Sequence, residues 1–142
     1  MIVLDGPLGT ELGRRGVATN LPRWSASALW AAPDVVRAIH RDYASAGARV
    51  HTANTFRTKR RTLGDAWERW ARLAVAIARE SIPTAHRVAG SIAPLEDCYR
   101  PERSPADASE HGELAAVLAD AGCDVLLCET FPHAEEALVA VG

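Results

Sequence analysis

Short apolar runs alternate along this chain with longer segments in which apolar residues recur every three or four positions. Four of the runs predict β-strands, at residues 2–4, 49–53, 87–92 and 124–128. The amphipathic segments predict α-helices at residues 33–46, 65–81, from about Pro105 or Ala106 to Ala121, and 134–141. Strands that alternate with helices in this way are typical of βα units, which build a parallel sheet.

Glycine and proline mark the ends of the predicted helices. Pro33 suits the first helical position, where its missing N–H is not needed. The sequence AGARV at residues 46–50 returns as AGCDV at residues 121–125, and in both cases a glycine ends a helix just before a strand. The result is four βα units of roughly 35 residues each, whereas a closed barrel needs about 250 residues. We therefore predict an α/β fold, the (β/α)4 half of a TIM (β/α)8 barrel with parallel strands.

An open doubly wound sheet is the alternative fold for a chain of this size. Such sheets usually carry a glycine-rich phosphate loop after the first strand. The segment GPLGT at residues 6–10 has two glycines but neither the GxGxxG pattern nor a P-loop lysine, so a dinucleotide site is disfavoured. In the segment 65–81, Trp67 and Trp70 lie on the apolar face and are expected to pack in the core or at an interface.

Composition narrows the function classes. The 142 residues are 48% hydrophobic with a formal net charge of −2, which fits one compact domain and disfavours a nucleic-acid-binding protein. No apolar run approaches the ~20 residues that span a bilayer, and the first residues do not resemble a signal peptide. Three cysteines without a CxxC pair argue against a disulfide framework. We expect a cytoplasmic protein with reduced thiols and without membrane or nucleic-acid partners.

Two carboxylates follow predicted strands at the end where parallel α/β proteins place their chemistry. Asp5 follows the first strand and Glu129 the fourth, so both are expected at the same edge of the sheet. Three interpretations remain open for this pair. The carboxylates could act as general acid and base, could bind a substrate ammonium group, or could simply cap the helices that follow.

A series of motifs resembles the homocysteine S-methyltransferases, the family that includes the betaine- and S-methylmethionine-dependent enzymes. In order, the motifs are LDGPLGTEL at 4–12, RRG at 14–16, WSA at 24–26, PDVV at 33–36, HRDY at 40–43, AGA at 46–48, TANTF at 52–56, GSIAP at 90–94, AGCD at 121–124 and ETFP at 129–132. Each motif is weak alone, but the ordered series covers nearly the whole chain. Pro7, where a small residue is common, and a short loop at 101–113 depart from the pattern.

The resemblance implies a TIM barrel whose N-terminal half is residues 1–142, with a homocysteine site. Asp5 and Glu129 match the acids expected to hold the ammonium group of homocysteine. Gly6, Gly9 and Thr10 match the turn that lets the substrate approach the backbone. Trp24 matches a tryptophan near the methyl donor, whose cationic centre an aromatic face can hold. A hydrophobic staple before the next helix is an equally good explanation for Trp24.

The resemblance also implies zinc, which binds the homocysteine sulfur and keeps it ionised for attack on a methyl group. In the family the zinc ligands are a cysteine after the sixth strand and a Gly-Gly-Cys-Cys segment, and neither motif is found in this chain. Cys98, Cys123 and Cys128 lack zinc-site spacing, so we expect them not to be ligands and assign no metal ligand here. The five histidines are scattered without ligand spacing.

A basic cluster, Arg57, Lys59, Arg60 and Arg61, follows the second predicted strand. It is expected to be a solvated loop, with attraction of an anionic donor tail as the alternative.

Three hypotheses about function follow. The first is a methyltransferase that makes methionine from homocysteine and an onium or folate donor, completed by a C-terminal half or by self-association. The second is an inactive fragment that only binds an amino acid. The third is a hydrolase or lyase that uses Asp5 and Glu129 as acid and base.

Overall fold

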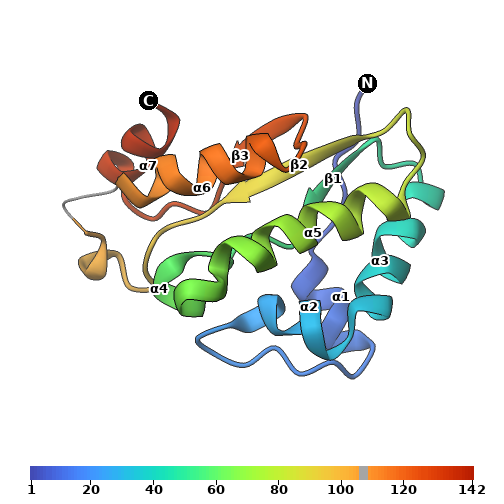
Figure 1. Ribbon diagram of the computed structural model, residues 1–142, viewed down its shortest axis with the longest axis horizontal. Helices are drawn as coiled ribbons and strands as arrows, with labels where there is room; N and C mark the ends of the chain where they lie inside the picture. The colour runs from blue at the N-terminus through green and yellow to red at the C-terminus, as the bar shows by residue number, and fades with distance from the viewer. Residues whose placement is uncertain (106–108) are drawn as a thin grey trace.

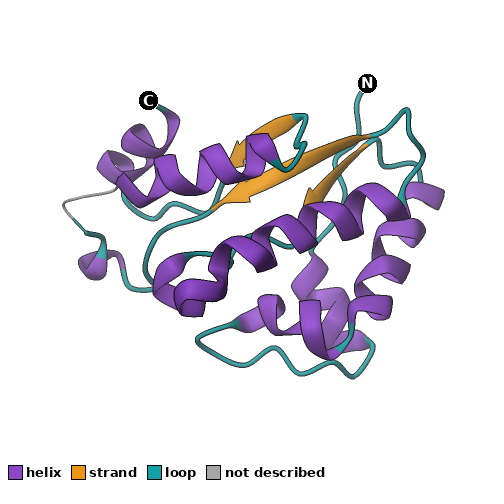
Figure 2. Ribbon diagram, in the orientation of Figure 1, coloured by secondary structure: helices purple, strands orange, loops and turns teal. Residues whose placement is uncertain are grey.

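The computed structural model describes residues 1–105 and 109–142 of the chain, and it has an α/β fold. Three parallel strands form the sheet within these residues, in the order β1 (Val50–Ala53), β2 (Arg87–Ile92) and β3 (Val125–Cys128). In the register of the sheet, Ala53 pairs with Gly90 and Ile92 pairs with Cys128. The three strands agree with predicted strands to within one residue, and their carboxyl ends lie at the same edge of the sheet (Figures 1 and 2).

The predicted first strand, residues 2–4, is reduced to a single parallel bridge between Leu4 and Val50. The segment still runs along the outer side of β1, because Arg49 N donates to Val3 O at 2.8 Å and Asp5 N donates to Val50 O at 3.0 Å. It has a neighbour on one side only among the described residues, and its apolar side chains are exposed. The prediction of a full strand was therefore wrong, although the segment lies where that strand was expected.

The predicted helices are confirmed as α3 (Pro33–Ser45), α5 (Trp67–Ser81), α6 (Ser109–Asp120) and α7 (Ala134–Val141). Of the two predicted starts of α6, Pro105 is not helical, and Ala106 lies outside the described residues. The pattern missed several short elements: α1 (Leu8–Arg14), α2 (Ala28–Ala31), α4 (Arg60–Leu63), and the 3-10 turns at Trp24–Ser27, Gly64–Ala66 and Pro101–Arg103. These elements span two turns or fewer, too few for an apolar period to emerge.

The core is built on both sides of α5, which lies across the same face of the sheet as α6 (Figure 1). Trp67, Ala71, Val75 and Ala78 of α5 pack in one cluster with the sheet residue Val88 and with α6. Ala74 and Ile77, on another side of α5, pack in a second cluster with α1, α2 and α3. Each large apolar side chain buried in this way contributes about 1.5–3 kcal/mol. The prediction that Trp67 and Trp70 are packing residues is confirmed, since Trp67 is buried and Trp70 packs against the second cluster.

Glycines end α3 and α6 in the predicted manner. Gly47 and Gly122 have φ of 105° and 93°, the left-handed conformation that a side chain disfavours. Gly90 in β2 is required for a different reason. A Cβ there would lie 2.9 Å from Leu118 Cδ1 and 3.0 Å from Cys123 Sγ, so α6 packs directly on the strand backbone.

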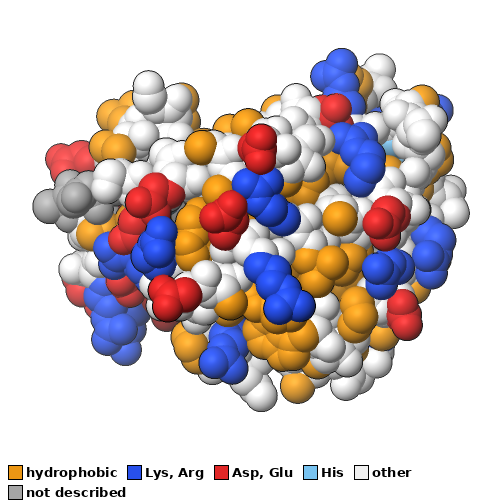
Figure 3. Space-filling model, in the orientation of Figure 1, with side chains coloured by type: hydrophobic (Ala, Val, Ile, Leu, Met, Phe, Trp, Pro, Cys, Tyr) orange, Lys and Arg blue, Asp and Glu red, His pale blue; other side chains and the backbone are white. Residues whose placement is uncertain are grey.

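Acidic and basic side chains are interspersed over the face that carries α5 and α6 (Figure 3). Arg72 of α5 illustrates this pattern, because it pairs with Glu68 at 2.9 Å and with Asp120 at 2.7 Å. A search of the described residues finds no helix of the length and apolarity that a membrane span requires.

Candidate active site

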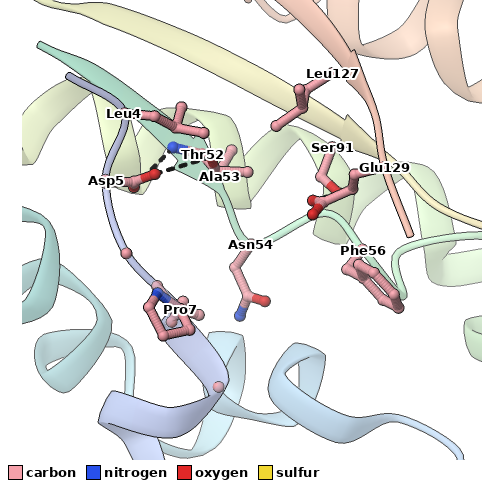
Figure 4. Close-up of a pocket in the computed structure, with 13 residues that line it drawn as sticks. Leu4, Asp5, Pro7, Thr52, Ala53, Asn54, Phe56, Ser91, Leu127 and Glu129 are labelled. Atoms are coloured by element: carbon pink, nitrogen blue, oxygen red, sulfur yellow. Dashed lines mark hydrogen bonds between the residues drawn. The ribbon is translucent and has the colours of Figure 1, made fainter.

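A pocket of about 350 Å³ lies at the carboxyl ends of the strands (Figure 4). Its wall is formed by residues 4–9, residues 52–54 at the end of β1, Phe56, Ser91 of β2, Leu127 of β3 and Glu129. Asp5 and Glu129 stand on opposite sides of this pocket, as the two strand ends predicted.

Asp5 is held in place by β1. Its Oδ2 accepts a hydrogen bond from Thr52 N at 2.8 Å and its Oδ1 accepts one from Thr52 Oγ1 at 2.9 Å. Burial raises the pKa of Asp5 to about 6, the negative charge of Glu129 adds to the increase, and the bonds from Thr52 oppose it. The pocket therefore holds a carboxylate that gains from any cation placed beside it.

Glu129 is positioned by β2. Its backbone N–H donates to Ile92 O at 3.0 Å, and its Oε1 accepts a hydrogen bond from Ser91 Oγ at 2.6 Å. Neither carboxylate acts as a helix cap. In the described chain, α1 begins after Pro7 and α7 after His133, and no side chain caps either helix. The capping interpretation was therefore wrong, and both acids are left facing the pocket.

The predicted turn residues lie beside Asp5. Gly6 and Gly9 line the pocket, whereas Thr10 is the next residue of α1, is exposed, and is not among the lining residues. A Cβ at Gly6 would lie 2.7 Å from Tyr43 Oη. A larger residue at this position would therefore force the Tyr43 ring to move.

Trp24 belongs to an aromatic cluster at the edge of the pocket. Its ring is stacked on Phe56, which lines the pocket, with 5.9 Å between centroids and 19° between planes. The guanidinium carbon of Arg57 lies 4.5 Å from the Trp24 ring centroid, and Tyr99 adds a tilted ring at 6.1 Å. This arrangement shows that the Trp24 ring already holds a cation.

Comparison with known proteins decides the family. A family model described as homocysteine S-methyltransferase matches residues 2–142. The chain belongs to the homocysteine S-methyltransferase family. Homocysteine S-methyltransferase YbgG of Bacillus subtilis is 31% identical over 168 residues, which cover 99% of this chain and 53% of that protein. Homocysteine S-methyltransferase of Escherichia coli is 28% identical, over 96% of this chain and 52% of that protein.

Solved structures of homocysteine methyltransferases have the same fold as this chain over nearly its whole length. The metallated form of the homocysteine methyltransferase MmuM from Escherichia coli superposes with a TM-score of 0.80 at 29% identity, over 96% of this chain and 57% of that one. The chain thus spans about half the length of these homocysteine S-methyltransferase relatives.

The cysteines do not fit the thiolate zinc site that the methyltransferase resemblance implies. Cys128 Sγ lies 3.5 Å from Ala140 O of α7, on the opposite face of β3 from the pocket. Cys123 Sγ packs at Gly90 in the core, and burial raises the pKa of its thiol to about 11. Cys98 is buried in the loop after β2. In the described residues, then, no cysteine lines the pocket.

The basic cluster is only partly a solvated loop, so that prediction was wrong for Arg57 and Lys59. Both are almost fully buried. Lys59 Nζ donates to Ala93 O at 3.1 Å and also to Pro94 O, and burial lowers its pKa to about 7. Strand-end loops therefore close around this lysine, which the sequence pattern could not show.

The other two arginines of the cluster form ion pairs with α6. Arg60 pairs with Glu113 at 3.5 Å and Arg61 pairs with Glu110 at 2.7 Å. Arg61 also pairs with Glu96 at 2.5 Å.

The sequence prediction missed a histidine cluster behind Asp5. One ligand atom each from Asp5, His40 of α3 and His51 of β1 lie within 4.8 Å of one another. His51 Nε2 lies 3.1 Å from His86 Nδ1, with the two rings stacked. Burial lowers the pKa of His51, and the charge of His86 lowers it further. The nearby backbone of Ala48 opposes this decrease, although His51 Nδ1 forms no hydrogen bond within the described residues.

A signal for these histidines was present in the sequence. His40 falls on the apolar face of its helix, one position after Ile39, and His51 falls on the inward side of its strand. Both positions predict burial, and a buried imidazole calls for a partner. The distance between them along the chain hid their proximity.

Proposed function

We propose that residues 1–142 form the N-terminal half of a TIM-barrel homocysteine S-methyltransferase and supply its amino-acid-binding site. The reaction is transfer of a methyl group from an onium or folate donor to the sulfur of homocysteine, which gives methionine. The observation that carries this proposal is the carboxylate pair, Asp5 and Glu129, across one pocket in a chain of this family.

A carboxylate pair of this kind suits the ammonium group of an amino acid. Each carboxylate uses hydrogen bonds to its neighbouring strand, Asp5 with Thr52 and Glu129 with Ser91, and each retains lone pairs for another donor. Burial raises the pKa of Asp5, and repulsion from Glu129 adds a smaller increase. An ammonium group between them removes that repulsion and forms charge-assisted hydrogen bonds.

The remaining pocket residues set the orientation of the substrate. Gly6 and Gly9 let the amino acid approach the backbone, and Thr10 follows in the same turn. The aromatic wall of Phe56 and Trp24 lies on the side proposed for the methyl donor. Since Arg57 lies over Trp24 and Trp24 is stacked on Phe56, the donor's cationic centre is expected to meet Phe56, which lines the pocket.

The metal chemistry of the family is assigned to residues outside this chain. Because Cys98, Cys123 and Cys128 do not face the pocket, no step is placed on a thiolate-bound metal held by residues 1–142. In the transfer itself, the sulfur–carbon bond forms as the donor–carbon bond breaks. The donor keeps the bonding electrons, and the thiol proton leaves to solvent. A separate C-terminal half, or a second copy of the chain, is proposed to complete the site.

Calorimetric titration of the purified chain with L-homocysteine tests the binding proposal. We expect the Asp5→Asn and Glu129→Gln variants each to weaken binding about 10- to 100-fold, the loss of one hydrogen bond to a charged group. Glu135→Gln is the matched control, because Glu135 is exposed on α7, and it should bind as the original chain does. N-acetylhomocysteine, which lacks the ammonium group, should not bind.

Two outcomes would count against the proposal or narrow it. Unchanged affinity in Asp5→Asn and Glu129→Gln would overturn the carboxylate–ammonium assignment. Homocysteine binding without methyl transfer, even when a C-terminal half of a relative is added, would favour the alternative that the chain only binds the amino acid.

A further inference from the structure

We propose that Asp5, His40 and His51 form a binding site for a divalent transition-metal ion of the zinc class, distinct from the thiolate site of the family. The three ligand atoms lie within 4.8 Å of one another. They come from three separate segments: the chain before α1, the helix α3 and the strand β1. A site of this kind ties the first segment, which forms only one bridge to the sheet, to its two neighbours.

His40 is the observation on which the proposal chiefly rests. Its side chain is 0% exposed, and within residues 1–105 and 109–142 neither of its ring nitrogens has a hydrogen-bond partner. His51 Nδ1 is also buried and without a partner in that part of the chain. Each unpaired buried polar group costs about 1–3 kcal/mol. A metal ion bound to one nitrogen of each ring removes this cost for one of the two His40 nitrogens and for His51 Nδ1.

The donor set selects the class of ion. Two imidazoles and one carboxylate are the ligands of many zinc sites and suit Co²⁺ and Ni²⁺ as well, whereas Mg²⁺ and Ca²⁺ prefer all-oxygen sites. Bonds of about 2.1 Å in a tetrahedral site separate ligand atoms by roughly 3.4 Å. Ligand atoms at the 4.8 Å limit of the cluster must therefore approach one another by up to about 1.4 Å when a metal binds. Three protein ligands leave the fourth position for water.

The surroundings of the ligands have the form of a supporting shell. Thr52 donates two hydrogen bonds to Asp5, which fixes the carboxylate while lone pairs remain for a metal. His86 Nδ1 lies 3.1 Å from His51 Nε2, so the proposal assigns the metal to the other ring nitrogen of His51, Nδ1. Histidine ligands of metals usually donate their other ring N–H to a carboxylate, a backbone carbonyl or water, and His86 Nδ1 would be the acceptor in that place here.

Arg49 determines how the proton is placed before a metal binds. A guanidinium group only donates, so the 3.1 Å contact from Arg49 Nη1 makes His86 Nε2 the acceptor. The His86 proton then sits on Nδ1 and is donated to His51 Nε2, which leaves the His51 proton on Nδ1. A metal at Nδ1 would require both rings to change tautomer: His51 would carry its proton on Nε2 and donate it to His86 Nδ1, and His86 would carry its proton on Nε2. His86 Nε2 could then no longer accept from Arg49, so the Arg49 contact would disfavour the metal-bound arrangement.

Titration of the purified chain with Co²⁺, followed by its visible absorption spectrum, tests the site. We expect one equivalent of Co²⁺ to bind with d–d bands and without the charge-transfer band of thiolate ligands, and Zn²⁺ to displace it. His40→Phe, which fills the same space without a ligand, and His51→Ala should weaken binding at least tenfold. His133→Ala is the matched control, a histidine outside the cluster, and should bind Co²⁺ as the original chain does.

Arg49→Ala is a second test, in which Co²⁺ affinity is expected to increase rather than decrease. A variant that merely failed to fold would lose affinity, so misfolding cannot produce this result. Arg49→Ala keeps all three ligands, and we expect it to tighten Co²⁺ binding several-fold. The proposal is overturned if the original chain binds no Co²⁺, which would leave a buried water as the occupant of the cluster. A thiolate band, or binding that survives His40→Phe, would overturn it as well. No homocysteine is present in these titrations, so their failure leaves the methyltransferase proposal untouched.

Discussion

At the scale of single residues, Lys59 couples the loops around the pocket to pH. Its side chain is 2% exposed, and its ammonium group donates to carbonyl oxygens of the loop after β2. Burial lowers its pKa to about 7, the charge of Arg57 lowers it further, and Glu136, Glu110 and Glu96 oppose the shift. In the unfolded chain the lysine keeps its ordinary pKa of 10.5. Between these two values, the unfolded chain binds a proton that the folded chain does not.

Stability should therefore rise with pH above about 7, by up to about 1.4 kcal/mol per pH unit from this group. We expect the free energy of unfolding to increase more between pH 7 and about 8.5 in the original chain than in Lys59→Met, by about 2 kcal/mol. Urea unfolding at both pH values measures this difference. Equal pH slopes in the two proteins would show that Lys59 is charged in the fold. Lys59→Met also leaves two carbonyl oxygens without their donor. This loss lowers the free energy of unfolding equally at both pH values, so it does not change the pH dependence that is compared.

The sequence placed Asp5 and Glu129 correctly at one pocket, because strand ends converge in any parallel sheet. It did not reveal that Arg57 and Lys59 are buried or that His40 meets His51. Burial of a charged side chain depends on loops folding over it from elsewhere in the chain. No periodicity within a single segment carries that information.

At the scale of elements, a buried glutamate joins α7 to the rest of the molecule. Glu136 accepts hydrogen bonds from Leu95 N at 2.8 Å, Ser104 Oγ at 2.5 Å and His111 Nε2 at 3.0 Å. Burial alone raises the pKa of Glu136, but the bonds from Ser104, Leu95 and His111 outweigh it and lower the pKa below its ordinary value. One carboxylate thus connects α7, α6 and the loop after β2.

Removing this carboxylate should loosen α7. We expect Glu136→Ala to lower the free energy of unfolding by about 2–4 kcal/mol, because it leaves several buried donors unpaired. Glu136→Gln, which keeps one oxygen acceptor, should cost less. Thermal and urea unfolding measure the changes, with Glu135→Ala on the exposed side of the same helix turn as the control. A loss in Glu135→Ala as large as in Glu136→Ala would show that the helix, rather than the buried network, is responsible.

The long elements were predictable because each repeats its apolar pattern over several turns, as α5 does from Trp67 to Ser81. The short helices were not. α1 contains two glycines and buries only Leu12, so its helical state depends on packing against α3 and α2 rather than on its own sequence. The same holds for the first segment, where an apolar run forms a single bridge because it has one neighbour.

At the scale of the whole molecule, two apolar margins of the sheet are exposed. On one side lie Ile2, Val3 and Leu4, next to β1. On the other lie Val125 and Leu126 of β3 together with Leu138, Val139 and Val141 of α7, of which Leu138 and Val141 are 73% and 75% exposed. In the described chain β3 pairs only with β2, so its outer backbone groups are unpaired. Edges of this kind pair readily with another strand.

We therefore expect the isolated chain to associate with itself, and its mean mass by sedimentation to rise with concentration. Val125→Lys with Leu138→Lys should reduce this association, because charge on an edge strand and its covering helix disfavours pairing. Leu21→Lys is the matched control: Leu21 is also exposed, but it lies outside both margins, so its substitution should leave the mass unchanged. If the chain stays monomeric at every concentration, the exposed apolar margins do not cause self-association, and this prediction is wrong. If Leu21→Lys dispersed the chain equally well, added charge rather than the margin would account for the result.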